Sequence, residues 1–478
     1  MAGQRRKGKS RRKGHPSGKG KVGRLQLIQQ DAAGIDIGAT SHFVAVPPNR
    51  DEEPVREFSA FTSGLYALAD WLEACGVTTV AMESTGVYWV PLYDLLEKRG
   101  IEVFLVNAQH VKGVPGRKSD VLDCQWLQQL HSYGLLRRSF RPESDFVTLR
   151  TYLRHRGDLV EARSSLIQRM QKVLTLSNLQ LHHVVTDISG ETGMRIIRDI
   201  LAGNHDPESL AKHRHYSCRA SAAEIAEALR GSFRDENLFL LRQAVELYDV
   251  YGIKLKECDE VIEKLLKTLV QAHGAKVTLP ALPEPSKRRT KRRPKEAQFD
   301  IRQPLHQMLG VDLTAVPGFA ELNSLQIIGE IGIDMTRWPD DHHFASWTTL
   351  APSCRITGGR ARSSRRPASA HRVAEILRMA AMNAGRTQTA LGAFYRRLAA
   401  RAGKAKAIVA LAAKLARIVY KMLRFRTAFI DLGVQAYEQR YQDRVLRNLQ
   451  RRAKALGFQL SPMSHSPQEN QEIGVTVS

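Results

Sequence analysis

Four carboxylic acids in the first third of this 478-residue sequence stand where a metal site would need them. Asp36 lies inside the apolar run G-I-D-I-G, where an ionised side chain is costly unless it is paired or bound to a metal. Glu83 ends a β-branched, apolar run and begins E-S-T-G. Asp120 and Asp123 stand three residues apart in K-S-D-V-L-D, a spacing that puts both on one side of a helix.

These acids suit a hard divalent cation, because Mg²⁺ takes carboxylates together with waters and phosphate oxygens. Two such ions about 4 Å apart can clamp the attacking and leaving oxygens of phosphoryl transfer. For Asp120 and Asp123 a structural explanation is also open, since the helix dipole favours acids in a first turn. Asp36 in a strand is harder to explain without a ligand. The sequence therefore predicts that the four acids bind Mg²⁺, or Mn²⁺.

A second chemical candidate is the segment 350–372, which is rich in arginine and has no acid. Guanidinium groups bind phosphate through paired hydrogen bonds and would stabilise charge that develops on phosphorus. A hydroxyl among them could attack a phosphodiester and hold it covalently. The alternative is a phosphate-binding loop without chemistry. The segment holds Arg355, Arg360, Arg362, Arg365, Arg366 and Arg372, with hydroxyls at Ser353, Thr357, Ser363, Ser364 and Ser369.

The charge of the chain indicates a polyanionic partner. The formal net charge is +24, and residues 1–24 hold ten Lys or Arg and no acid. Residues 287–295, which begin with Lys287, Arg288 and Arg289, hold seven more. Most of the excess therefore lies on two segments too polar to fold alone, and we expect them to contact nucleic-acid phosphates. A basic arm that serves only solubility is the alternative.

The cysteines and the apolar runs point to the cytoplasm. Five cysteines at wide spacings, with no C-x-x-C pair, argue against a disulfide framework and against a cysteine-based zinc site. No apolar run is long enough to span a membrane, and no secretory signal follows the basic start. We expect a cytoplasmic, nucleoid-associated protein with no membrane partner.

The elements that must position the acids read as an α/β domain followed by helices. The order of three strands, helix, strand, helix, strand and helix is that of a ribonuclease-H-like, RuvC-like domain. The expected strands are 33–37, 42–46, 55–61, 77–82 and 102–106, and the expected helices are 65–72, 87–96 and 119–130.

The rest of the chain is expected to be mainly helical. Apolar residues from Leu241 to Leu269 recur at steps near 3.5, as in a coiled coil, with Gly252 and Asp259 as interruptions. A hairpin that dimerises and one that packs within its own chain remain equal alternatives. The expected divisions are a basic tail (1–30), the RuvC-like domain (31–145), a helical or coiled-coil region (146–275), a basic Pro-rich linker (276–305), a mainly helical C-terminal domain (306–435) and a C-terminal helix with a disordered tail (436–478).

At this point the motifs resemble a known family, the IS110-type insertion-sequence transposases. G-I-D-I-G, M-E-S-T-G-V-Y-W and K-S-D-V-L-D match its N-terminal DEDD domain. V-P-G-F, F-A-S-W-T-T-L-A-P and R-I-T-G-G-R match its C-terminal transposase domain. The resemblance covers roughly residues 32–430 and implies that Asp36, Glu83, Asp120 and Asp123 are the Mg²⁺-binding acids.

The resemblance also implies a hydroxyl nucleophile, and here the sequence departs from the family. Members use a serine before a glycine in the C-terminal domain, whereas the matching residue is Thr357 in R-I-T-G-G-R. Threonine keeps the hydroxyl but adds a methyl and a stiffer χ1. Three outcomes are open: Thr357 is the nucleophile, Ser363 or Ser364 serves instead, or this copy binds DNA and cleaves poorly.

The function that follows is DNA strand cleavage and rejoining, with element ends and target DNA as substrates. By resemblance we also expect a guide RNA and a homo-oligomer, either dimer or tetramer. Two alternatives are a metal-dependent hydrolytic nuclease of the junction-resolving type and an inactivated copy that only binds nucleic acid. A hydrolytic nuclease has no use for R-I-T-G-G-R beside a helical domain, which favours the transposase.

Overall fold

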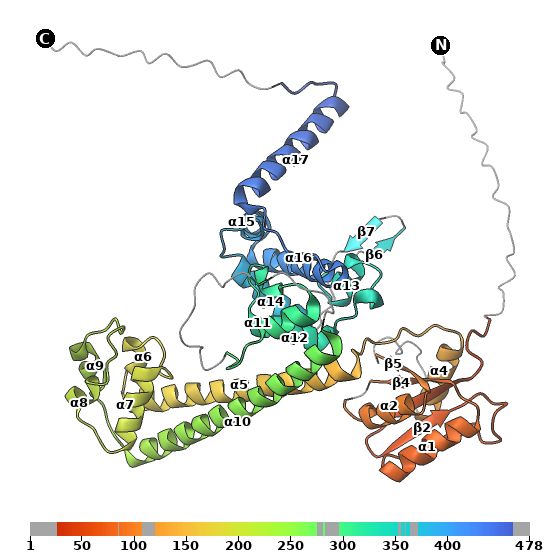
Figure 1. Cartoon of the computed structure of the whole chain (residues 1–478), viewed down its shortest axis with the longest axis horizontal. Coiled ribbons are helices and arrows are strands. Elements are labelled where there is room, and N and C mark those ends of the chain that lie inside the picture. The colour runs from red at the N-terminus through yellow and green to blue at the C-terminus, as the bar shows by residue number, and fades with distance from the viewer. Residues whose placement is uncertain are drawn as a thin grey trace, which may run out of the picture. The chain divides into compact units, whose positions relative to one another are not determined.

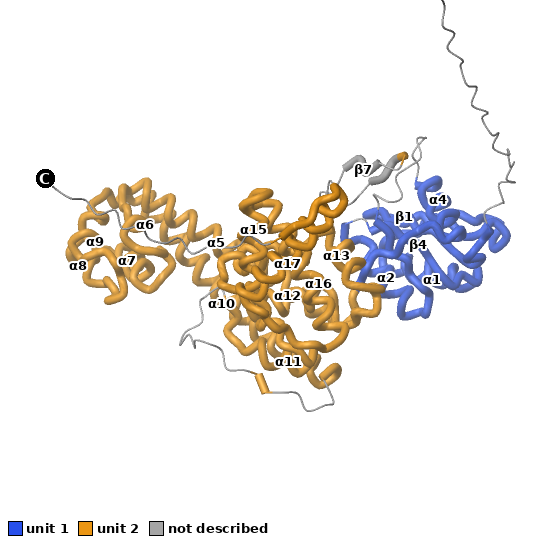
Figure 2. Tube along the Cα trace, turned by 90° about the horizontal axis from the view of Figure 1, so that it is seen from above, with its two compact units in different colours: residues 1–141 blue, residues 142–478 orange. Residues whose placement is uncertain are grey.

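The computed structural model divides the chain into two compact units, residues 1–141 and residues 142–478 (Figure 2). The residues described are 26–84, 86–107, 120–274, 281–282, 296–351, 355–358, 360–363 and 371–461, with 355–357 and 360–363 described by their backbone.

The first unit is a mixed five-stranded sheet with helices (Figure 1). The strand order is β3-β2-β1-β4-β5, in which β1 to β3 pair antiparallel and β1, β4 and β5 pair parallel. The expected order of elements is confirmed, and with it the RuvC-like α/β architecture. The elements are β1 (Ala32–Ile37), β2 (Ser41–Ala45), β3 (Val55–Ser59), α1 (Thr62–Ala74), β4 (Thr79–Glu83), α2 (Trp89–Lys98), β5 (Glu102–Val106) and α4 (Asp120–Ser132).

Successive side chains along each strand point to alternate sides of the sheet, so its two faces pack against different helices. Ile35 and Ile37 of β1 and Met82 of β4 lie in one buried cluster with the apolar residues of α1 and α2. Residues of the other parity, such as Gly34, lie against α4. Each strand therefore contributes to both layers. The layer beside α4 is the one that carries the acids.

The second unit begins with two long helices, α5 (Ser144–Leu176) and α10 (Asp235–His273), which pack along each other (Figure 1). The apolar residues of α10 that recur in the sequence are buried, from Leu241 to Leu269. They pack against a helix of the same chain, as in the second of the two alternatives. Four short helices cluster at the far end of this pair: α6 (Leu181–Val184), α7 (Glu191–Leu201), α8 (Pro207–Ala211) and α9 (Ala222–Ala228).

The two interruptions of the apolar pattern leave α10 unbroken. Gly252 faces Arg163, whose guanidinium lies 4.0 Å from the centre of the Tyr248 ring. Asp259 is 4% exposed and accepts from Arg156 Nε at 2.6 Å. Glycine therefore makes room for one arginine, and the aspartate neutralises a second one.

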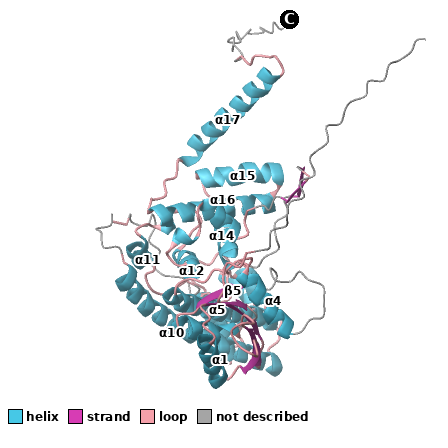
Figure 3. Cartoon of the chain, turned by 90° about the vertical axis from the view of Figure 1, so that its right-hand side faces the viewer, coloured by secondary structure: helices cyan, strands magenta, loops and turns pink. Residues whose placement is uncertain are grey.

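The remaining elements form a mainly helical body (Figure 3). Arg154 of α5 donates two hydrogen bonds of 2.8 Å to Glu330 of α12 and so ties this body to the long helices. The elements are α11 (Arg302–Leu309), η1 (Leu313–Ala315), α12 (Glu321–Ile331), η2 (Met335–Arg337), α13 (Asp341–Trp347), β6 (Arg355–Thr357), β7 (Arg360–Ser363), α14 (Arg372–Ala384), α15 (Ala390–Ala402), α16 (Lys404–Phe425) and α17 (Gly433–Ala455).

Four of the five cysteines lie within the described residues. Cys75, Cys124, Cys218 and Cys258 are free thiols, and Cys354 lies outside the described residues. Among the helices that the structure describes, none has the length and apolar character needed to cross a bilayer.

Candidate active site

Two of the four acids are brought together by the register of the parallel strands. Ile35 of β1 lies opposite Met82 of β4, so Asp36 and Glu83 follow at the carboxyl ends of neighbouring strands. Ile35 and Met82 share the buried face toward α1 and α2, which puts the next residue of each strand on the face toward α4. The carboxyl ends of parallel strands are where α/β sheets place ligands.

The other two acids are positioned by the close approach of α4 to β1. A Cβ on Gly34 would lie 2.3 Å from both the Cys124 carbonyl oxygen and the Gln128 amide nitrogen. Only glycine permits this approach without a shift of the helix. The Gln128 side chain also donates to the Ala32 carbonyl oxygen at 3.2 Å, and the His131 ring lies 2.9 Å from the Thr79 hydroxyl.

This packing sets the first turn of α4 beside Asp36. Asp36, Asp120 and Asp123 each offer a carboxylate oxygen, and these oxygens lie within 4.8 Å of one another. Asp120 is exposed, whereas Asp36 and Asp123 are partly buried. Glu83 is also partly buried but is not one of the three that converge. An oxygen-only donor set with solvent access on one side suits Mg²⁺ or Mn²⁺.

A thiol beside the acids does not join this donor set. Cys124 is fully buried, and its Sγ lies 3.1 Å from the Val121 carbonyl oxygen. Burial, together with the nearby Asp36 charge, raises the pKa of the Cys124 thiol to about 12. The thiol therefore stays protonated at neutral pH, and the site offers carboxylates alone.

Gly34 permits the close approach of α4, and it was not among the residues predicted from the sequence. It stands two residues before Asp36 in the same apolar strand. A glycine inside a strand often marks a place where another backbone approaches closely. That signal, read with Asp36, would have predicted a helix on this face.

The hydroxyl candidate lies on a hairpin of the second unit. Thr357 ends β6 and pairs with Arg360 of β7. Gly358 follows in the turn, exposed and with φ of 58°, a left-handed conformation that glycine adopts without strain. The hairpin therefore carries Thr357 at the edge of a tight turn.

The other predicted nucleic-acid contacts are placed only in part. Arg355 is in β6, and Arg360 and Arg362 are in β7, where they belong to the same hairpin as Thr357. The remaining predicted contacts, Arg365, Arg366, Lys287, Arg288 and Arg289, lie outside the described residues, as do Ser364 and Ser369.

Aromatic rings lie near both ends of the arginine-rich segment 350–372. Trp347, near its start, and His371, at its end, have ring centroids 4.4 Å apart.

Asp340 accepts the amide hydrogens of His342 and His343 and so begins α13. The run of Asp and His at 340–343 is therefore a helix entry rather than a metal site.

Two family models match parts of the chain that contain these residues. Residues 33–178 match the transposase family of the IS110 DEDD domain, and residues 312–396 match the family described as transposase IS116/IS110/IS902. No curated protein is similar enough to be matched. The first match contains all four acids, and the second contains Thr357 and its hairpin. The chain therefore carries a match to the DEDD domain of the IS110-type insertion-sequence transposases, followed by a match to the C-terminal transposase domain of that family.

Proposed function

We propose that the chain cleaves and rejoins DNA strands at an insertion sequence in a reaction that depends on Mg²⁺ or Mn²⁺. The observation that carries this proposal is the convergence of Asp36, Asp120 and Asp123, with Glu83 on the adjoining strand end. Three carboxylates gathered this closely repel one another unless a cation is shared between them. A bound divalent ion would supply charge neutralisation for a phosphodiester that undergoes attack.

In this proposal the four acids would hold a divalent ion, which would supply positive charge at the DNA phosphate. Thr357 supplies the nucleophile from the hairpin of the second unit. Its oxygen forms a bond to phosphorus, and the bond from phosphorus to the leaving DNA oxygen breaks. The threonine proton is lost to solvent, and the leaving oxygen takes one up. Attack by a DNA hydroxyl on the protein–DNA bond then rejoins the strand and releases the threonine.

Arginines of the same segment stabilise the charge on phosphorus. Arg355, Arg360 and Arg362 flank the turn that follows Thr357. Guanidinium groups aimed at phosphate oxygens stabilise the transition state more than the ground state. By family resemblance, the chain works as a homo-oligomer on element ends and target DNA, guided by an RNA of the element.

The test is denaturing-gel detection of a covalent protein–DNA adduct. The full chain is incubated with its element-end DNA, guide RNA and Mg²⁺, and wild type is compared with Thr357→Ala, Thr357→Ser and Asp36→Asn. The proposal predicts an adduct with wild type and Thr357→Ser and none with the other two. Asp70→Asn, an exposed acid of α1 paired with Arg99, is the matched control and should form the adduct.

Each other outcome assigns a different function. An adduct that survives Thr357→Ala moves the nucleophile to Ser363 or Ser364. An adduct with Thr357→Ser but not with wild type indicates an inactivated copy that binds nucleic acid. Free nicked DNA without an adduct in any variant indicates a hydrolytic nuclease.

A further inference from the structure

Helix α17, residues Gly433–Ala455, lies beyond both family matches and has a surface that the transposase domains do not explain. None of its residues is buried. It extends away from the neighbouring helices of its unit in Figure 1. A helix this exposed is not held by a core of its own, so its side chains are available to a partner.

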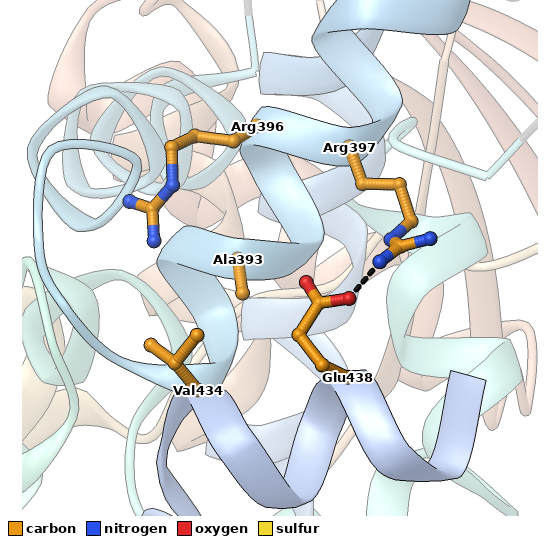
Figure 4. Close-up of a pocket in the computed structure, with 5 residues that line it drawn as sticks. All are labelled: Ala393, Arg396, Arg397, Val434 and Glu438. Carbon is orange, nitrogen blue, oxygen red and sulfur yellow. Dashed lines mark hydrogen bonds and ion pairs between the residues drawn. The ribbon is translucent and has the colours of Figure 1, made fainter. Parts of the chain in front are cut away.

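The first half of α17 is anchored to α15. Figure 4 shows the pocket between the two helices, where Arg397 of α15 is paired with Glu438 of α17. The Arg397 guanidinium also lies 3.5 Å from the centre of the Tyr441 ring, and the Phe394 ring packs against Tyr437. These contacts fix the direction in which the rest of α17 extends.

From Arg440 onward, α17 carries a continuous row of cations, which we call the basic stripe. Its members recur at steps of four and three residues, so they lie on one side of the helix. From first to last they span about 21 Å at 1.5 Å per residue. The basic stripe consists of Arg440, Arg444, Arg447, Arg451 and Lys454.

The charge of the basic stripe is not neutralised by the helix itself. Asp443 is the one acid between Arg440 and Lys454 in the sequence. Within the part of the chain that the structure describes, no ion pair joins a member of the stripe to an acid. Burial lowers the pKa of Lys414 on α16, and the nearby charges of Arg444 and Arg417 lower it further. The region thus has a positive potential that attracts an anion.

We propose that the basic stripe binds the phosphate backbone of a DNA duplex outside the cleavage site. The inference rests on the proposed action on DNA. A single helix fits the major groove of B-form DNA, whereas the major groove of duplex RNA is too deep and narrow for side chains to read. At 3.4 Å per base-pair step, a stripe of about 21 Å spans about six steps. Most of these contacts go to phosphates, so binding is largely independent of sequence.

A second copy of the chain is the competing occupant of α17. The side of α17 opposite the basic stripe exposes apolar residues, and Leu446 is 52% exposed and Leu449 47% exposed. A second copy that packed on this apolar side would leave both basic stripes facing outward and would not neutralise them. The charge of the basic stripe therefore favours a polyanion as its occupant.

The test measures DNA affinity without metal, so that no cleavage occurs. Fluorescence anisotropy follows the full chain binding to a labelled 30-base-pair DNA duplex of arbitrary sequence at several salt concentrations. The triple variant Arg444→Gln, Arg447→Gln, Arg451→Gln is expected to lose about tenfold in affinity, and its salt slope should fall by about three. Unchanged helical circular dichroism verifies that α17 is retained.

The matched control removes the same charge elsewhere. Arg195→Gln, Lys254→Gln and Lys267→Gln neutralise three exposed cations that are already paired with glutamates. The salt slope of this control should stay within one unit of wild type. A labelled RNA duplex of the same length is titrated in parallel, and the loss with the stripe variant should be smaller for RNA than for DNA.

Three results would overturn the inference. The first is a stripe variant whose DNA affinity and salt slope equal those of the control. The second is a loss confined to the RNA duplex. The third is unchanged DNA binding by the stripe variant together with a smaller oligomer for Leu446→Ser, Leu449→Ser, which would assign α17 to a second copy. Failure of the Thr357 adduct would leave this binding result intact, so the two proposals fail separately.

Discussion

The two units of this chain treat their acids in opposite ways. In the first unit, the carboxylate oxygens of Asp36, Asp120 and Asp123 lie within 4.8 Å of one another at the ends of their elements, beside solvent. In the second unit, Asp259 is 4% exposed in the middle of a helix pair and accepts a 2.6 Å hydrogen bond from Arg156. An acid that serves stability is paired and buried. The acids proposed to serve chemistry are gathered where a ligand can reach them.

The buried pair is where the comparison predicts the largest change in stability. Asp259→Ala leaves the Arg156 charge buried without its partner, which should cost about 3 to 5 kcal/mol of unfolding free energy. The loss should be seen in faster hydrogen exchange of α5 and α10 in the full chain, measured by mass spectrometry.

The control for this prediction replaces both partners. Arg156→Met with Asp259→Leu removes the charges and keeps the volume apolar, so stability should return to wild type or exceed it. The backbone amide of Gln298, which donates to Asp259 at 3.2 Å, loses that acceptor in both variants. Equal destabilisation by the single and double variants would show that the pair does not matter electrostatically.

The gathered acids depend on Gly34, and Gly34→Ala is the change that should separate them. The new methyl group would meet the α4 backbone at 2.3 Å, so α4 must move away from β1. Overpacking of this kind costs about 1 to 3 kcal/mol. Hydrogen exchange of α4 should rise, and adduct formation with element-end DNA should fall by about a hundredfold.

Gly157→Ala is the matched control for Gly34→Ala. Gly157 lies inside α5. The substitution also adds a methyl group, but no atom outside the helix's own neighbouring backbone lies within 4 Å of it. Alanine in a helix interior is favoured over glycine by about 1 kcal/mol, so stability should rise and activity should not change. Full activity of Gly34→Ala would mean that the position of α4 does not govern the site.

His131 adds a third case to the comparison, a titratable group buried with a neutral partner. Its ring is 1% exposed and lies 2.9 Å from the Thr79 hydroxyl, and burial lowers its pKa to about 4. The folded state therefore resists protonation, while the unfolded state takes up a proton near pH 6.5. Stability is lost as the pH falls below that value, by about 1 kcal/mol between pH 7 and pH 5.5.

Hydrogen exchange of β4 and α4, corrected for the intrinsic pH dependence, measures this loss. His131→Gln should reduce it. The pKa of His42 in the same unit is also lowered by burial, so part of the pH dependence of stability remains in His131→Gln. A pH dependence unchanged by His131→Gln would contradict the assignment.

The sequence predicted the order of strands and helices well because these elements depend on local patterns. Short apolar and β-branched runs identified β1 and β4, and an ion inside an apolar strand singled out Asp36 as a candidate ligand. The sequence indicated Asp259 only as an interruption of an apolar pattern, because its partner Arg156 lies 103 residues away and only packing brings the two together. Thr357 was singled out as the candidate nucleophile through resemblance alone, since no periodicity distinguishes one hydroxyl among several in this segment.

Calorimetric titration of Mg²⁺ into the full chain tests the central claim, that the gathered acids form a metal centre, most directly. Wild type is compared with Asp36→Asn and with Asp70→Asn, an exposed acid of the same unit. The account predicts binding by wild type and Asp70→Asn, and an affinity at least about tenfold lower for Asp36→Asn. Equal Mg²⁺ binding by all three proteins would contradict it.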